Sequence, residues 1–217
     1  MKISNNIKKL REEISTLNTI HNTKHTTKIL AVTKTATNRQ IQEAINSGVH
    51  GIAENRVSSA EKKFPFIDNV EKHMIGHLQR NKVKRAIRIF DVIQSVDSLR
   101  LAKEISKRAK DENKIMKIML QVNTSGEEQK FGLSEDEVEE NYKKIIMLEN
   151  IKVVGLMMMA PLVQAEETRE YFSKANIIRE KLKLKEFSAG MTNDYKVAIE
   201  EGSTMIRMGR AIFNQSL

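Results

Sequence analysis

The chain of 217 residues is long enough for one substantial hydrophobic core, and we expect a single domain over residues 1–217. Its 40% apolar and 30% charged residues exclude a disordered chain, and the absence of cysteine excludes disulfides, thiolate nucleophiles and cysteine-bound metals. The formal net charge of +9 is spread along the chain, and we interpret its densest cluster as the solvated face of one helix, so a nucleic-acid partner is not expected; the cluster consists of Arg80, Lys82, Lys84, Arg85 and Arg88.

The first residues lack the apolar core of a secretory signal, and no stretch approaches the roughly 18 consecutive apolar residues of a membrane-spanning helix. We therefore expect a cytoplasmic protein without a membrane partner. Ile3, Ile7, Leu10, Ile14 and Leu17 follow at spacings of four and three, which predicts an amphipathic helix. The stripe lasts barely two heptads, so the helix is expected to pack on the domain rather than form a coiled coil.

Eight short apolar runs follow, and each is too brief for a buried helix but typical of a strand that is covered on both faces. They occupy residues 28–34, 49–53, 73–76, 90–93, 115–120, 153–158, 187–189 and 205–208. Helical patterns lie between them. Capping boxes at residues 37–40 and 134–137 each start one, and Tyr171, Ala175, Ile178 and Leu182 form an apolar stripe on another.

Eight strands, each followed by a helical segment, predict an α/β fold, a single (β/α)8 TIM-type barrel with an extra N-terminal helix. The length lies near the lower limit of about 200 residues for this fold. A doubly wound open sheet is the alternative, because counting strands does not distinguish the two.

In a barrel, functional residues gather where strands end. The first run ends in Lys34 and the last two lead to residues 190–192 and 207–210. A glycine at the end of the eighth strand, Gly209, and the helix start that follows are suited to an anion, with hydroxyl or charged donors on Ser188, Thr192 and Arg210. Separately, the glycine is typical of a tight turn and the lysine of a surface residue. Together they are what a pyridoxal 5'-phosphate (PLP) site requires.

Several stretches resemble the pyridoxal phosphate homeostasis proteins, in order and over nearly the whole chain. They are residues 31–34 (AVTK), 51–56 (GIAENR), 73–82 (HMIGHLQRNK), 121–133 (QVNTSGEEQKFGL), 155–157 (GLM), 188–194 (SAGMTND) and 202–213 (GSTMIRMGRAIF). The resemblance implies a fold-type III PLP barrel like the N-terminal domain of alanine racemase. It also implies that PLP is held as a Schiff base on Lys34.

The resemblance assigns further roles around the cofactor. Asn55 would lie near it, Thr192 would bind its phosphate with Ser188 as the serine of the seventh strand, and Arg207 would lie beside the pyridine nitrogen; backbone phosphate contacts fall on Met191, Gly209 and Arg210. Three positions depart from the common family pattern, namely Ala189, Arg210 and Asn214. The side-chain role of Arg210 is therefore left open, whereas its backbone N–H is not affected.

The implied function is PLP homeostasis, as a carrier or buffer rather than a catalyst, with PLP-dependent apo-enzymes as further partners and a monomeric chain. A weakly active PLP-dependent amino-acid racemase is the alternative. An arginine stays protonated and does not make the pyridine nitrogen cationic, which disfavours carbanion chemistry. A racemase also needs a second base, and related racemases take a tyrosine from a following domain that we do not expect here. The chain's own tyrosines are Tyr142, Tyr171 and Tyr195.

Other residues have simpler interpretations. His73 and His77 lack carboxylate partners at ligand spacing, so no metal site is expected, although one of them could contact the cofactor. The run from Met157 to Met159 predicts barrel core and rim. Lys130 is interpreted as an exposed loop lysine, with exchange of the cofactor with Lys34 as the alternative.

Overall fold

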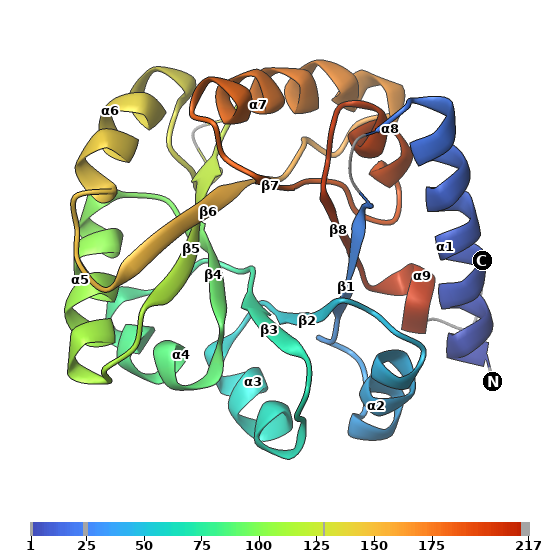
Figure 1. Cartoon of the computed structure of the whole chain (residues 1–217), viewed down its shortest axis with the longest axis horizontal. Coiled ribbons are helices and arrows are strands. Elements are labelled where there is room, and N and C mark those ends of the chain that lie inside the picture. Colours follow the sequence, from blue (N-terminus) through green and yellow to red (C-terminus); the bar gives the residue numbers. More distant parts are fainter. Residues whose placement is uncertain (1, 24–25, 128, 214–217) are drawn as a thin grey trace.

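Eight parallel strands close into a barrel in the computed structural model, which describes residues 2–23, 26–127 and 129–213 (Figure 1). Each strand pairs with its neighbour in the sequence, and β8 returns to pair with β1. The strands are β1 (Lys28–Val32), β2 (Gly51–Glu54), β3 (Glu71–Met74), β4 (Val92–Val96), β5 (Met116–Val122), β6 (Ile151–Met158), β7 (Glu186–Ser188) and β8 (Met205–Met208). The eight predicted strands and the TIM-type barrel are confirmed, and the doubly wound alternative is wrong.

Helices surround the barrel: α2 to α8 connect consecutive strands, whereas α1 precedes β1 and α9 follows β8 (Figure 1). They are α1 (Lys2–Ile20), α2 (Asn38–Asn46), α3 (Val57–Lys63), α4 (Val83–Ile89), α5 (Leu99–Asp111), α6 (Glu135–Ile145), α7 (Arg169–Lys181), α8 (Tyr195–Glu200) and α9 (Arg210–Phe213). Short 3-10 turns are η1 (Phe64–Phe66), η2 (Arg80–Lys82) and η3 (Glu166–Thr168). Both predicted capping boxes are confirmed, because Thr37 and Ser134 each exchange hydrogen bonds with the residue three positions later.

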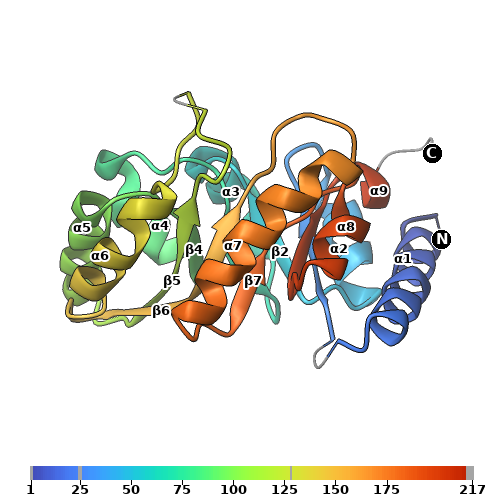
Figure 2. The same cartoon turned by 90° about the horizontal axis from the view of Figure 1, so that it is seen from above.

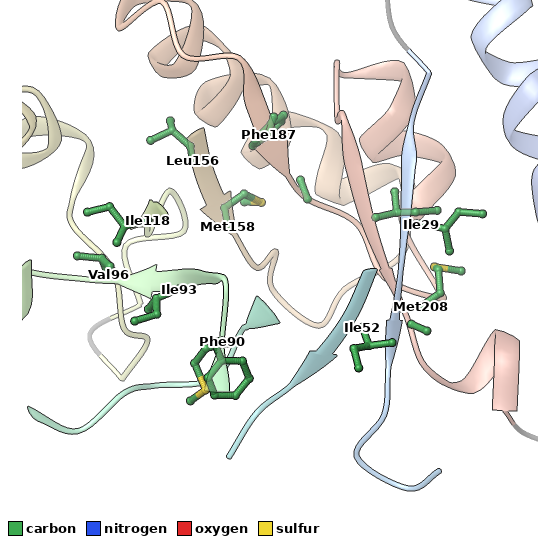
Figure 3. Close-up of a cluster of buried hydrophobic side chains, with 14 of the residues drawn as sticks. Ile29, Ile52, Phe90, Ile93, Val96, Ile118, Leu156, Met158, Phe187 and Met208 are labelled. Atoms are coloured by element: carbon green, nitrogen blue, oxygen red, sulfur yellow. The ribbon is translucent and has the colours of Figure 1, made fainter. Parts of the chain in front are cut away.

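Apolar side chains form two layers on opposite faces of the strands. The inner layer fills the barrel and contains Leu30, Val32, Ala53, Ile75, Val92, Met119, Met157 and Met205. The outer layer packs between the strands and the helices, where Figure 3 shows Ile29, Ile93, Phe187 and their neighbours. Met157 and Met158 fall into the two layers and Met159 is 39% exposed, which confirms the predicted core and rim.

The predicted N-terminal helix is confirmed as α1, which lies against one flank of the barrel (Figure 1). Ile3, Ile7, Leu10 and Ile14 are buried on its inner face, and it packs on α2, α8 and α9. Its Asn6 side chain donates a hydrogen bond to the Ile212 carbonyl oxygen at 3.1 Å. The helix therefore supports the two short helices that follow β7 and β8.

Two local predictions need correction. The first strand ends at Val32, so Lys34 lies in a turn two residues later. The basic cluster extends over η2 and α4 rather than one helix. Its residues are exposed, as predicted, except for the half-buried Lys82. The charge is partly neutralised, because Arg85 pairs with Glu61 and Arg88 pairs with Glu112 at 2.7 Å. Over the described ranges, no helix is long and apolar enough to cross a membrane.

Candidate functional site

All eight strands are parallel, so their carboxyl ends meet at one end of the barrel. Figure 2 shows the loops after β5 and β6 on this side, while the connection between α1 and β1 lies on the opposite side. Every residue assigned to a cofactor site lies at or just beyond a carboxyl end of a strand. The closed barrel thus brings together residues that are up to 176 positions apart, from Lys34 to Arg210.

Lys34 follows the end of β1 at the mouth of the barrel. Leu30 and Val32 face the barrel interior, and the Thr33 N–H still donates to the Ala53 carbonyl oxygen at 2.9 Å, so backbone pairing continues up to the residue before Lys34. Its side chain is exposed, and its Nζ forms no hydrogen bond or ion pair with any described residue. The Lys34 amine is therefore accessible to solvent in the protein alone.

A buried ion pair supports the turn that carries Lys34. Lys63 on α3 lies 2.8 Å from Glu54 Oε1 and also donates to the Thr33 carbonyl oxygen at 2.6 Å. Glu54 is only 1% exposed and additionally accepts the Thr33 hydroxyl at 2.9 Å. Two strand ends and one helix are thereby linked beneath the lysine. The sequence did not predict that Lys63 and Glu54 support this turn, because Lys63 resembles any other lysine at the basic end of a helix.

Asn55 lies directly after β2 with an exposed side chain. Its backbone packs on Gly76 in the loop after β3, where a Cβ would come within 2.2 Å of the Asn55 carbonyl oxygen. Any side chain at position 76 would displace this backbone. The glycine of the third motif therefore serves to hold the Asn55 loop against its neighbour.

Arg207 is the buried cation of the site. It lies on the inner side of β8, is 3% exposed, and donates to the Ser188 carbonyl oxygen at 2.7 Å, to Ser188 Oγ at 2.8 Å and to the Met158 carbonyl oxygen at 2.8 Å. Burial lowers its pKa to about 10, although the negative charge of Asp194 acts to raise it. Among residues 2–23, 26–127 and 129–213, no carboxylate lies at ion-pair distance from the guanidinium.

The loop after β7 is shaped by Asp194. Its Oδ1 accepts the Met191 N–H at 2.6 Å, so this predicted phosphate donor already has a partner within the loop. Burial raises the pKa of Asp194, an effect opposed by the Met191 hydrogen bond and the Arg207 charge. The hydroxyl of the half-buried Thr192 forms no hydrogen bond with a described residue. Thr192 is therefore a free donor at this strand end, whereas Met191 would have to exchange partners.

The loop after β8 contributes Gly209 and Arg210. A Cβ on Gly209 would lie 3.6 Å from Val32, an ordinary contact, so the fold itself does not demand a glycine here. A glycine would also permit close approach of a ligand to the backbone. The first N–H groups of α9 have no partner inside the helix. The Arg210 side chain bridges to Asn193 at 3.2 Å, which links the two loops.

The loops after β3, β4 and β5 meet at the opposite side of the barrel mouth. His77 stacks on Phe131 with ring centroids 3.7 Å apart, and its Nδ1 lies 3.1 Å from Asp97 Oδ2. Lys130 is half-buried and pairs with Glu127 at 2.6 Å, so it is not the exposed loop lysine that the sequence suggested. Within the part of the chain that the structure describes, no group of three metal-binding side chains is assembled.

The chain is similar to known proteins over almost its whole length. The family model described as alanine racemase, N-terminal domain, matches residues 5–216. A pyridoxal phosphate homeostasis protein of Aquifex aeolicus is 37% identical over 197 residues, which cover 87% of this chain and 86% of the relative. PipY of Synechococcus elongatus, solved with PLP bound, is 29% identical to this chain, with a TM-score of 0.87. The alignment covers 98% of this chain and 100% of PipY.

Alanine racemase of Clostridium difficile shares the fold, with a TM-score of 0.76 at 15% identity. The alignment covers 99% of this chain and 56% of the racemase. At this level of identity the likeness concerns the barrel alone.

Proposed function

Because this chain belongs to the pyridoxal phosphate homeostasis protein family, we propose that it binds PLP at the carboxyl end of its barrel and serves PLP homeostasis as a carrier or buffer. Relatives with 30 to 37% identity over most of the chain carry that name, and the similar PipY has been solved with PLP bound. The residues of this chain fit such a ligand in three places, namely Arg207, Lys34 and the loops after β7 and β8.

The observation that carries the proposal is the buried guanidinium of Arg207. Three of its five N–H groups are bonded to Ser188 and Met158, which leaves Nε–H and one Nη2–H for another acceptor. A cation buried without an acidic partner is costly in a protein interior, and such groups are enriched at functional sites. The pyridine nitrogen of PLP is an acceptor that could bind one of these two free N–H groups of Arg207.

Lys34 is the residue proposed to hold the ligand covalently. PLP supplies an aldehyde, which condenses with a neutral lysine amine and releases one water molecule. The Lys34 amine has no partner among the described residues, so no interaction must be broken first. Its turn is fixed from below by Lys63 and Glu54. A lysine that is held in place but unpaired is suited to this reaction.

The phosphate is assigned to the loops after β7 and β8. Thr192 offers an unpaired hydroxyl, and the start of α9 offers backbone N–H groups at Gly209 and Arg210. Met191 is a further backbone donor once its N–H exchanges its Asp194 partner. We assign Asn55 to the ring side of the site, since it follows the strand beside β1.

A carrier is favoured over a racemase by two features of the site. Even with its pKa lowered to about 10, Arg207 is charged at neutral pH and has no proton to spare for the pyridine nitrogen. Tyr195, the tyrosine nearest in sequence to the phosphate loop, donates its hydroxyl to Glu13 on α1. Tyr142 and Tyr171 lie on α6 and α7 outside the barrel. PLP-dependent apo-enzymes are the proposed recipients of the cofactor.

Titration of the purified protein with PLP, followed by absorbance, tests the proposal. We expect saturable binding that Lys34→Ala weakens strongly and that pyridoxal, which lacks the phosphate, does not reproduce. The exposed Lys62 on α3 provides the matched control, so Lys62→Ala should bind like the unmodified protein. Absence of binding, or equal binding by Lys34→Ala, would overturn the proposal. Rapid interconversion of D- and L-alanine by the loaded protein would overturn the carrier role alone.

A further inference from the structure

Four polar side chains form a column inside the barrel. His73, Gln94 and Ser188 are 0% exposed and Arg207 is 3% exposed, and they come from β3, β4, β7 and β8. Apolar residues of the inner layer lie around them, so these side chains depend on one another for hydrogen bonds. Only Arg207 and Ser188 belong to the predicted cofactor site. The column therefore extends the site into the barrel.

The hydrogen bonds of the column run in one direction. Arg207 Nη1 donates to Ser188 Oγ at 2.8 Å, Ser188 donates to Gln94 Oε1 at 2.7 Å, and Gln94 Nε2 lies 2.9 Å from His73 Nδ1. Gln94 Nε2 also contacts the Met205 sulfur at 3.2 Å, which suits an amide N–H rather than an amide oxygen.

Both ends of the column fix that direction. A guanidinium only donates, so Ser188 Oγ must accept from Arg207 and turn its own proton toward Gln94. At the other end, His73 Nε2 lies 3.0 Å from Glu71 Oε2, although the ring N–H is not aligned for a hydrogen bond. A carboxylate only accepts, so it favours the His73 proton on Nε2 and leaves Nδ1 as the acceptor for Gln94.

Charged side chains pair with one another near the amino ends of the strands, on the side of His73. Lys117 on β5 pairs with Glu71 on β3 at 2.8 Å, and Lys28 on β1 pairs with Glu186 on β7 at 2.6 Å. Glu71 is therefore kept ionised and faces the histidine. The order of donors is thus supported by Glu71 at the far end of the column as well as by Arg207 at the cofactor end.

We propose that His73 and Gln94 are positioning residues for PLP, because their fixed hydrogen-bond direction holds Ser188 as an acceptor and so sets the orientation of Arg207 toward the cofactor ring. This inference rests on the proposed PLP function and deepens it. If the column is cut, the Ser188 hydroxyl is free to turn, and Arg207 keeps only its bonds to the Ser188 and Met158 carbonyl oxygens as fixed contacts. The spare N–H groups of the guanidinium would then no longer be aimed at one acceptor.

Two variants test the column through PLP binding. We expect Gln94→Leu and His73→Leu to weaken PLP binding on the order of tenfold, the effect of one lost hydrogen bond to a charged group, and to shift the absorbance maximum of the bound cofactor. Ser95→Ala is the matched control, because Ser95 is buried on the same strand with an unpaired hydroxyl outside the column. It should leave both quantities unchanged. Unchanged affinity and spectrum in both folded leucine variants would overturn the proposal.

A measurement on the unmodified protein without PLP keeps the test independent of variant folding. Nitrogen-15 NMR of the histidine rings should show His73 as the neutral form with its proton on Nε2, with the signal assigned through His73→Leu or, if that variant does not fold, His73→Asn. A proton on Nδ1 would contradict the column even if PLP binds. Failure of the unmodified protein to bind PLP, with the Nε2–H form present, would instead overturn the proposed function and leave the column's direction intact.

Discussion

Removing Lys63 should destabilise the protein strongly, although this residue lies on a peripheral helix. In Lys63→Met, the Glu54 carboxylate stays buried with only the Thr33 hydroxyl at 2.9 Å and the Asn55 N–H at 3.3 Å. Breaking a buried ion pair by removing one partner costs about 3–5 kcal/mol. We expect about 3 kcal/mol, the lower end of that range, because the Lys63 side chain is 18% exposed and admits some water.

A double-mutant cycle separates the charge effect from lost packing. In Glu54→Gln/Lys63→Met neither charge remains, and we expect a loss of only about 1 kcal/mol, that of an ordinary hydrogen bond. Urea unfolding at pH 7 measures both. With a slope of about 2 kcal/mol per molar urea, Lys63→Met should lower the midpoint by about 1.5 M. A Lys63→Met protein that loses under about 1 kcal/mol, or a double variant no more stable than the single one, would refute the reasoning. Lys62→Met, next to it and exposed, should be nearly neutral.

Three further predictions concern other parts of the barrel. Tyr195→Phe removes the hydroxyl bonded to Glu13 and should lower the free energy of unfolding by about 1 kcal/mol in urea, without changing PLP affinity. The contact with His73, with Lys117 adding to it, lowers the pKa of Glu71 to about 2, below its usual 4.5, so its stabilising effect is present above pH 4.5 and lost as the pH falls toward 2. Glu71→Gln should therefore flatten the decline of the urea midpoint below pH 4.5, and an unchanged decline would contradict this. Gly76→Ala places a methyl group 2.2 Å from a backbone oxygen and should cost about 1–3 kcal/mol in thermal unfolding, with weaker PLP binding.

The sequence predicts much of this barrel because its strands are buried on both faces. Such strands appear as continuous apolar runs, and helix caps such as Thr37 and Ser134 mark the segments between them. Closure is harder to foresee, because it depends on the pairing of β8 with β1, which are distant in the sequence. The end of β1 was also misplaced, because the apolar run of residues 28–34 does not show where strand pairing gives way to a turn.

The site was predicted unevenly for a related reason. Lys34, Arg207 and Gly209 are recognisable because they lie in motifs at strand ends. The partners that orient them are single polar residues within apolar strands or on a neighbouring helix. Gln94 lies two residues after Val92 and therefore on the same inner side of β4. This spacing is a signal that could have identified it. Lys63 carried no such signal, since its contact depends on how α3 folds back beneath the first turn.

The central claim is that PLP binds covalently to Lys34, and one measurement tests it most directly. The protein is incubated with PLP, reduced with borohydride, digested and mapped by mass spectrometry. We predict that the pyridoxyl mass is found on the peptide that contains Lys34 and is absent from that position in Lys34→Ala. Label on another lysine, such as Lys130 or Lys63, or no label at all, would contradict the account.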